Sequence, residues 1–352
     1  MKKKVTLAVS MIVILSMLSG CNSLQQKPTV KNIKIGVTLY DQYDTFLSQL
    51  MNDFNEYAAQ EETNTGLAVN VEEHNAATSQ STQNSQVENM INDGCNVICV
   101  NLVDRTEPTT IIDMAEKNNI PVIFFNRELV EEDLQRWDRL YYVGASAKES
   151  GVMQGELAAD YISKHPEADK NKDGMIQYVV LEGEAGHQDA IVRTESSVST
   201  LMSKGVVMEK LGYAIANWNR AQAQTKMSQL ITQFGSKIEL VLPNNDDMAL
   251  GAIDALQDAK IPREKWPVIV GIDGTDVGLQ AVQSGEMAGT VYNDKEGQAK
   301  AMLELSFDLA TGKDYSNLKL ENGKYIRLPY TKITSKEVSK YLNRMKSNSL
   351  DE

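Results

Sequence analysis

Cysteine is scarce in this sequence, and that scarcity excludes one class of fold. The 352 residues include three cysteines, of which Cys95 and Cys99 share the stretch CNVICVNL. If that stretch is a strand, at about 3.3 Å per residue, the two lie on one face about 13 Å apart, too far to bridge. The sequence therefore excludes a disulfide framework and predicts two buried free thiols.

Positive charge is also in short supply. The chain has 35 Lys and Arg against 48 Asp and Glu, a net charge of −13. Nucleic acids are bound mainly through Lys and Arg, so we expect no nucleic-acid partner. A ligand-responsive repressor would also need a helix-turn-helix at its N-terminus, where this chain instead has three lysines followed by an apolar run. The acidity itself agrees with simple solubility.

Long apolar runs are absent except at the N-terminus. Three lysines precede VTLAVSMIVILSMLSG, a run shorter than the roughly 20 residues of a membrane span and ending in small residues. The following LSGC resembles the lipobox of bacterial lipoproteins, and an ordinary secretory signal is the alternative. We expect a signal peptide (1–20), a tether (21–32) lipidated at Cys21, and a location on the outer face of a bacterial cytoplasmic membrane.

The remaining chain alternates strand-like and helix-like segments in two similar halves. Runs such as IKIGVTLY and PVIFFN are continuously apolar, which indicates strands buried on both faces of a parallel sheet. Their alternation with amphipathic segments predicts an α/β protein with two doubly wound parallel-sheet lobes. Ligands of such sheets bind outside the carboxyl ends of the strands.

Polar and aromatic side chains gather at the ends of these predicted strands. Taken singly, the acids suit helix N-caps, the asparagines suit turns and the aromatic residues suit the core. Taken together they suit a polyhydroxyl ligand, whose hydroxyls donate and accept hydrogen bonds and whose C–H faces flat rings can cover. The candidate residues are Asp44, Phe46, Asn126, His187, Asp189, Arg193, Trp218, Asn245, Asp273 and Asn293.

The stretch DKNKDGMIQ has the opening of a calcium loop. Asp169, Asn171 and Asp173 alternate, and Gly174 stands at the sixth position. An EF-hand would place a bidentate Glu at the twelfth position, inside a helix, but that position is Val180 in a strand-like run. The residues alone leave open an unmetallated turn or a calcium loop closed by a carboxylate from elsewhere.

Eight motifs, in their order and spacing, resemble the galactose/glucose-binding proteins of the type I periplasmic binding protein family. The resemblance covers about residues 33 to 335. It implies a monomeric receptor, not an enzyme, that captures D-galactose, D-glucose or a methyl-galactoside for an ABC permease and its ATPase. The motifs are IGVTLYDQYDTF, PVIFFNRE, YYVGASAKESGVMQGEL, DKNKDGMIQ, GEAGHQDAIVRT, NWNRAQAQTKM, NNDDMALGA and AGTVYNDKEGQAKA.

The resemblance also implies roles for single residues. It assigns Asp44 to the region of the sugar's 4-hydroxyl, Phe46 and Trp218 to the two sugar faces, and the other seven candidates to polar contacts. It closes the calcium loop with a distant carboxylate, that of Glu239 in KIELVLP. The implied ligands of a single structural calcium ion are Asp169, Asn171, Asp173, the Met175 backbone carbonyl, Gln177 and Glu239.

A three-segment hinge between the lobes follows from the same resemblance. We expect crossovers near 143–146, 292–294 and 326–331, with closure of the lobes over the sugar. The implied N-terminal lobe is 33–143 plus 294–328, and the C-terminal lobe is 144–293 plus 329–346.

Two other functions stay open at this stage. The same binding module could present its sugar to a chemoreceptor or a sensor kinase. A carbohydrate hydrolase could use a carboxylate pair, such as Asp44 with Asp189 or Asp273, although no nucleophile motif accompanies them.

Overall fold

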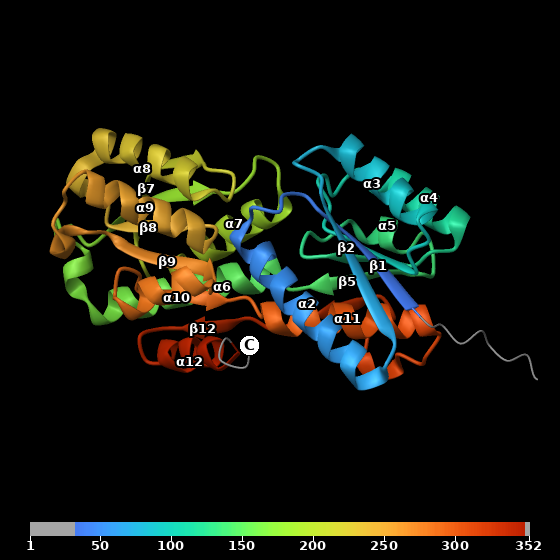
Figure 1. Cartoon of the computed structure of the whole chain (residues 1–352). Coiled ribbons are helices and arrows are strands. Elements are labelled where there is room, and N and C mark those ends of the chain that lie inside the picture. The colour runs from blue at the N-terminus through green and yellow to red at the C-terminus, as the bar shows by residue number, and fades with distance from the viewer. Residues whose placement is uncertain (1–31, 349–352) are drawn as a thin grey trace, which may run out of the picture. The chain divides into compact units, whose positions relative to one another are not determined.

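Two six-stranded sheets form the frame of the structure, a computed structural model that describes residues 32–348. The predicted signal peptide, tether residues 21–31 and the lipidation site Cys21 lie outside these residues. Within the described range, no helix combines the length and the apolar character that crossing a membrane requires. The two sheets confirm the predicted α/β architecture (Figure 1).

The first sheet is entirely parallel, with the strand order β11-β5-β4-β3-β1-β2. Its central strands are short runs of Val, Ile and Phe that are buried on both faces, as parallel strands between helices must be. The strands are β1 (Asn32–Leu39), β2 (Ala68–Asn75), β3 (Val97–Val100), β4 (Val122–Phe125), β5 (Leu140–Gly144) and β11 (Tyr325–Arg327).

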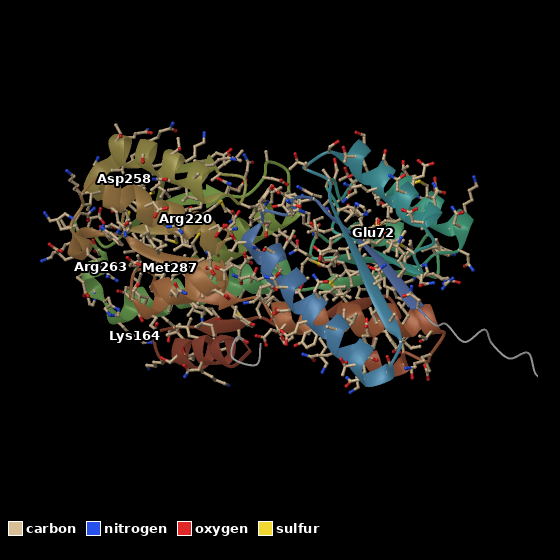
Figure 2. All side chains as sticks on the ribbon, in the orientation of Figure 1. Glu72, Lys164, Arg220, Asp258, Arg263 and Met287 are labelled. Carbon is tan, nitrogen blue, oxygen red and sulfur yellow. The ribbon has the colours of Figure 1, made fainter. Side chains whose placement is uncertain are left out.

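Helices cover both faces of this sheet. Helices α3 and α4 pack on one face in a core with Val87, Ile98 and Phe124, while α2 and α11 pack together on the other face. At the edge, Glu72 of β2 pairs with Lys34 at 2.7 Å (Figure 2). The helices are α2 (Thr45–Thr65), α3 (Gln80–Asn92), α4 (Thr109–Asn118), α5 (Glu131–Leu134) and α11 (Lys295–Thr311), with the 3-10 turn η4 (Ser316–Leu318).

The second sheet has the order β12-β10-β9-β8-β6-β7 and is parallel except for β12, which pairs antiparallel with β10. Its similarity to the first sheet reflects the two similar halves of the sequence. The strands are β6 (Ile176–Glu182), β7 (Met208–Ile215), β8 (Leu240–Pro243), β9 (Val268–Asp273), β10 (Gly289–Tyr292) and β12 (Thr331–Ile333).

Helices also sandwich the second sheet. One face carries α6 and α7, and the other carries α8, α9, α10 and α12. The helices are α6 (Ala147–Lys164), α7 (Gln188–Ser203), α8 (Arg220–Phe234), α9 (Asp246–Asp258), α10 (Asp276–Gln283) and α12 (Val338–Asn348), with η1 (Pro166–Ala168), η2 (Gly235–Lys237) and η3 (Arg263–Lys265).

Two glycines allow α6 and α7 to pack closely. A Cβ at Gly151 would lie 2.6 Å from the Arg193 carbonyl oxygen, and one at Gly155 would lie 2.6 Å from the Ser197 carbonyl oxygen. A larger residue at either position would force the helices apart. Arg193 lies on α7, so this close packing sets the position of its backbone relative to α6.

The chain passes between the two sheets three times. Residues 145–146 join β5 to α6, residues 293–294 join β10 to α11, and residues 328–330 join β11 to β12. Each connection is two or three residues long, so little backbone joins the two lobes.

The expected arrangement of the cysteines is partly wrong. Both are free and buried, but β3 begins at Val97 and so leaves Cys95 outside the strand. Cys95 packs in the core beneath α3 and α4, whereas the Cys99 thiol lies 3.6 Å from the Ser306 hydroxyl of α11. The two side chains therefore lie on opposite faces of the sheet, and the period-two argument did not apply to a residue that precedes the strand.

Candidate binding site

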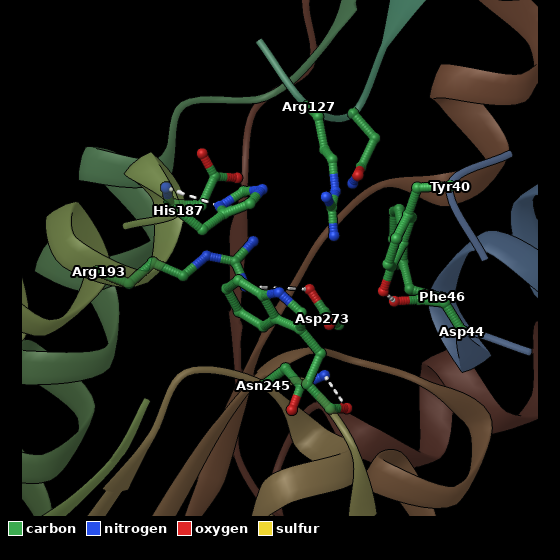
Figure 3. Close-up of a pocket in the computed structure, with 11 residues that line it drawn as sticks. Tyr40, Asp44, Phe46, Arg127, His187, Arg193, Asn245 and Asp273 are labelled. Atoms are coloured by element: carbon green, nitrogen blue, oxygen red, sulfur yellow. Dashed lines mark hydrogen bonds and ion pairs between the residues drawn. The ribbon is translucent and has the colours of Figure 1, made fainter. Parts of the chain in front are cut away.

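A small cavity lies between the carboxyl ends of the two sheets (Figure 3). Nine of the ten candidates from the sequence line it, and they come from the ends of six different strands. The lining residues are Tyr40, Asp44, Phe46, Asn126, Arg127, His187, Asp189, Arg193, Trp218, Asn245 and Asp273.

The tenth candidate, Asn293, lies beside the cavity and is not part of its lining. Its backbone N–H donates to the Asp273 carbonyl at 3.0 Å, and its side-chain oxygen accepts from Gln298 Nε2 at 2.6 Å. Asn293 thus lies in the second connection between the lobes, hydrogen-bonded through its backbone to Asp273, which does line the cavity.

Residues from the end of β1 and the start of α2 form the wall on the first lobe. Asp44 caps α2 by accepting from the Leu47 N–H at 2.9 Å, and its other oxygen accepts from the Tyr40 hydroxyl at 2.8 Å. Burial, followed by the Asp44 charge, raises the pKa of Tyr40. Phe46, in the first turn of α2, is buried with its ring at the cavity. The N-cap and the site role of Asp44 therefore coexist.

Three lining residues have positive φ angles, which residues other than glycine rarely adopt. The φ angles are +60° at Asn126, +61° at Trp218 and +109° at Asp273. Such conformations are costly and cluster at ligand sites, where the surrounding structure enforces them. The Trp218 ring packs directly on Gly183, where an added Cβ would lie 2.3 Å from the indole. The strain thus aims particular side chains into the cavity.

His187 is held in its neutral form with a defined tautomer. Burial, with further contributions from Arg127 and Arg193, lowers the pKa of His187 to about 2. As the N-cap of α7, its Nδ1 accepts from the Asp189 N–H at 3.2 Å. The ring proton must therefore sit on Nε2, which makes that atom a donor. The ring also meets the Trp218 indole edge-on, with centroids 5.3 Å apart.

Arg193 lines the cavity and also contacts residues from three other segments of the chain. Its Nη1 donates to the Asn244 carbonyl at 2.8 Å and lies 3.6 Å from Asp273 Oδ1. Its Nη2 donates to the Tyr330 hydroxyl at 3.3 Å. Only 5% of the side chain is exposed, so water screens this guanidinium poorly and its electrostatic interactions are stronger than at the surface.

The two acids near Arg193 resist ionisation. Burial raises the pKa of Asp189 and raises that of Asp273 well above its usual value, and in both cases Arg193 opposes the shift. Carboxyl groups in such positions gain from hydrogen-bond donors that a ligand brings.

Three lining side chains carry buried nitrogen atoms that have no partner among the described residues: His187 Nε2, Arg193 Nε and Trp218 Nε1. Unpaired buried donors are rare in native proteins, and each indicates an absent partner. These donors share the cavity with the carboxyl groups of Asp44 and Asp273 (Figure 3). A partner that accepts from the nitrogens and donates to the carboxyls is a molecule with several hydroxyl groups.

Sequence reasoning missed Tyr40 and Arg127 in this lining. Tyr40 ends the run IKIGVTLY and Arg127 directly follows Asn126. The strand-end rule that selected their neighbours would have found both. Arg127 lies over the Tyr40 ring, with its guanidinium carbon 3.5 Å from the ring centroid. The two residues therefore make a cation–π contact in the wall of the cavity.

The predicted calcium loop lies between η1 and β6, and Glu239 directly precedes β8. The Glu239 carboxylate accepts from the backbone N–H groups of Lys170 at 2.6 Å and Gln177 at 3.1 Å. The structure thus brings the distant carboxylate onto the loop. In the described residues, no three or more His, Cys, Asp or Glu side chains form a metal-holding group.

The loop offers mainly oxygen atoms as possible metal ligands. The backbone N–H of Met175 holds the pKa of Asp173 below its usual value, so this carboxylate is ionised. Asn171 Nδ2 donates to Asp173 at 2.9 Å and to Gln177 Oε1 at 3.0 Å. A half-turn of the Asn171 amide exchanges its nitrogen for an oxygen, giving the oxygen-rich set that calcium prefers. The residues therefore fit a calcium ion.

Residues 35–314 match the profile of the periplasmic binding protein domain family. The chain belongs to this family. A relative, the D-galactose/methyl-galactoside binding periplasmic protein MglB of Haemophilus influenzae, is 36% identical over 312 residues, covering 88% of this chain and 92% of that protein. A xylitol-binding protein of Mycolicibacterium smegmatis is 31% identical over 297 residues, covering 84% and 78%.

Solved structures agree with the family assignment. An ABC transporter solute binding protein of Bacillus halodurans, with bound myo-inositol, superposes with a TM-score of 0.75 at 26% identity, covering 90% of this chain and 99% of that one. The chain is therefore a solute-binding protein and not an enzyme, as predicted. The hydrolase alternative is excluded on the same grounds.

The buried neutral His187 predicts a pH-dependent stability that a non-titrating cap would lack. Its folded pKa is below the unfolded value, so protons bind the unfolded chain first and stability is lost as pH falls below about 6.5. His187→Asn keeps an N-cap acceptor. Between about pH 7 and pH 5, the parent should lose about 2 kcal/mol more unfolding free energy than the variant. Urea unfolding at both pH values measures the difference.

The raised pKa values of Asp189 and Asp273 act in the opposite direction, but both proteins contain these acids, so their effect cancels in the comparison. Equal pH slopes for parent and variant would contradict the neutral assignment of His187.

Proposed function

We propose that this protein captures a single hexose, D-galactose, D-glucose or a methyl-galactoside, between its lobes and delivers it to an ABC permease. The proposal rests on one observation above others: three unpartnered nitrogen donors share a cavity with buried carboxyl groups and the aromatic rings of Tyr40, Phe46 and Trp218. It is supported by the 36% identity to a galactose-binding relative. The lining holds three carboxyl groups against two guanidinium groups, a near balance that suits an uncharged ligand.

Both lobes are needed to satisfy such a ligand. The first lobe provides Asp44, Phe46 and Asn126, and the second provides His187 and the residues that follow it. A hexose that bonds to both lobes favours the closed state by the contacts it makes only there. Closure also removes water from these hydrogen bonds, which strengthens each of them. The permease would then distinguish the closed, loaded form from the open one.

The location follows from the N-terminal sequence. We propose that residues 1–20 are removed and that Cys21 carries lipid, which holds the protein on the outer face of the cytoplasmic membrane. The family supports an extracytoplasmic protein. The lipobox-like LSGC supports the anchor.

Titration calorimetry of the full mature chain with a panel of monosaccharides tests the proposal. We expect one site per chain and a clear preference for D-galactose, D-glucose or methyl-galactoside over a pentose and a polyol, with the sugar recovered unchanged. Xylitol and myo-inositol belong in the panel because relatives are named for them or contain them. Tighter binding of either, or no heat with any hexose, would overturn the assignment.

Trp218 should contribute apolar contact with a sugar face. Trp218→Ala should weaken hexose binding by about 1–3 kcal/mol, because it exposes the C–H face that the ring covers. Calorimetry gives the affinity, and Trp137→Ala is the matched control because that partly buried ring lies in the first-lobe core, away from the cavity. An affinity equal to that of the control would remove Trp218 from the contact set.

We further propose that the loop holds one structural calcium ion through Asp169, Asn171, Asp173, the Met175 carbonyl, Gln177 and Glu239. The ion would neutralise the carboxylates where the loop meets the sheet. A metal that binds only the folded state raises the free energy of unfolding.

Chelation should therefore destabilise the parent by about 2–4 kcal/mol in calcium buffer, whereas Glu239→Gln should show little further loss. Thermal melts with and without chelator measure both. Glu209→Gln, at an exposed site on β7, should respond to chelator like the parent. If chelator shifts all three melts equally, Glu239 is not a ligand.

A further inference from the structure

Arg127 is attached to the first lobe from several sides. Its Nη1 donates to the Val103 carbonyl at 3.0 Å, and its guanidinium lies on the Tyr40 ring. The left-handed turn at Asn126 directs the chain into this position, and only 4% of Arg127 is exposed. The side chain is therefore held in place without help from a ligand.

The other end of the same guanidinium reaches the second lobe. Nη2 of Arg127 lies 3.1 Å from Glu184 Oε2, in the loop between β6 and α7. Glu184 does not line the cavity, and its side chain is 31% exposed. The ion pair therefore joins one lobe to the other beside the cavity, which Arg127 lines.

A second contact crosses the same boundary. The Thr45 hydroxyl at the start of α2 donates to Asp247 Oδ2 at the start of α9, at 2.6 Å. Thr45 adjoins Asp44 in the sequence, and Asp247 follows Asn245 by two, so this contact also lies next to the cavity. Neither contact requires a ligand atom.

We propose that the Arg127–Glu184 ion pair is a latch across the cleft that sets how slowly the bound sugar leaves. The inference rests on the proposed function for its ligand but not for its geometry. The pair exists only when the lobes are together, so it adds to the stability of the closed state. A partly desolvated charge pair of this kind acts mainly on dissociation. Arginine suits the role because its planar fork holds Nη1 and Nη2 in fixed directions, one on Val103 of the first lobe and the other on Glu184 of the second.

Glu184→Gln is the most informative variant, because it removes the charge, keeps the shape and leaves every lining residue unchanged. We expect release of galactose, followed by stopped-flow fluorescence of the full mature chain, to become roughly tenfold faster, with association changed much less. Added salt should speed release from the parent more than from the variant, because salt screens the partly exposed pair.

Asp113→Asn is the matched control. It breaks the Arg136–Asp113 pair, 2.7 Å long, which lies within the first lobe and does not cross the cleft. Its release rate should equal that of the parent. A Glu184→Gln rate within twofold of the parent, or one matched by Asp113→Asn, would overturn the latch.

A second measurement needs no sugar. In small-angle scattering of ligand-free protein, Glu184→Gln should have a larger radius of gyration than the parent, because closed molecules become rarer. Identical profiles would count against the latch. If the parent binds none of the sugars, the proposed function fails, and the ligand-free scattering alone decides whether the latch exists.

Discussion

The guanidinium of Arg193 is the interaction on which the second lobe's half of the site depends. It bonds to the Asn244 carbonyl beyond β8, lies against Asp273 at the end of β9 and donates to Tyr330 in the third connection between the lobes. Its own position comes from the close packing of α7 on α6 at Gly151. Removing a buried charge of this kind leaves its partners uncompensated, at a cost of several kcal/mol. One side chain thus joins two strand ends and a hinge segment.

The electrostatics of the cavity follow from that arrangement. Burial raises the pKa values of Asp189 and Asp273 more than Arg193 lowers them, and burial, assisted by the neighbouring arginines, lowers the pKa of His187 and keeps it neutral. The site is therefore close to neutral overall yet rich in unsatisfied hydrogen-bonding groups. Leaving such groups unpaired costs roughly 1–3 kcal/mol each, so a matching ligand gains affinity by relieving a cost already present in the folded protein.

The sequence predicted most of the site because parallel sheets have a simple geometry. In a doubly wound lobe, every strand ends at the same edge, so polar residues that follow buried runs must converge, however distant they are in sequence. That rule alone was enough to place Asn245 and Asp273 together, because each stands at the end of a strand of the second sheet. It also shows why Asp44 and Asn245 could not be assigned to capping or to binding alone: each caps a helix and lines the cavity.

What the sequence did not predict depends on contacts between elements. The strand-end rule would have found Arg127, but no local pattern joins it to its partner Glu184, which belongs to the other lobe. Asn293 follows a strand as the others do, but Gln298 draws its side chain away from the cavity. The prediction for Cys95 assumed that it belongs to the strand, but β3 begins two residues later, at Val97. Each of these outcomes was decided by packing or pairing at a distance, which periodicity does not register.

Closure then has two sources of free energy that act on one equilibrium. Sugar contacts favour the closed state only when sugar is present, whereas Arg127–Glu184 and Thr45–Asp247 favour it always. Apparent affinity rises with the fraction of molecules already competent to bind, so contacts between the lobes tighten binding without touching the ligand. The same contacts carry an opposite penalty, because an empty protein that stays closed would admit sugar slowly and would resemble the loaded form to a permease. The partial exposure of Glu184 limits the free energy that the Arg127–Glu184 pair adds to the closed state, so the empty lobes can still separate.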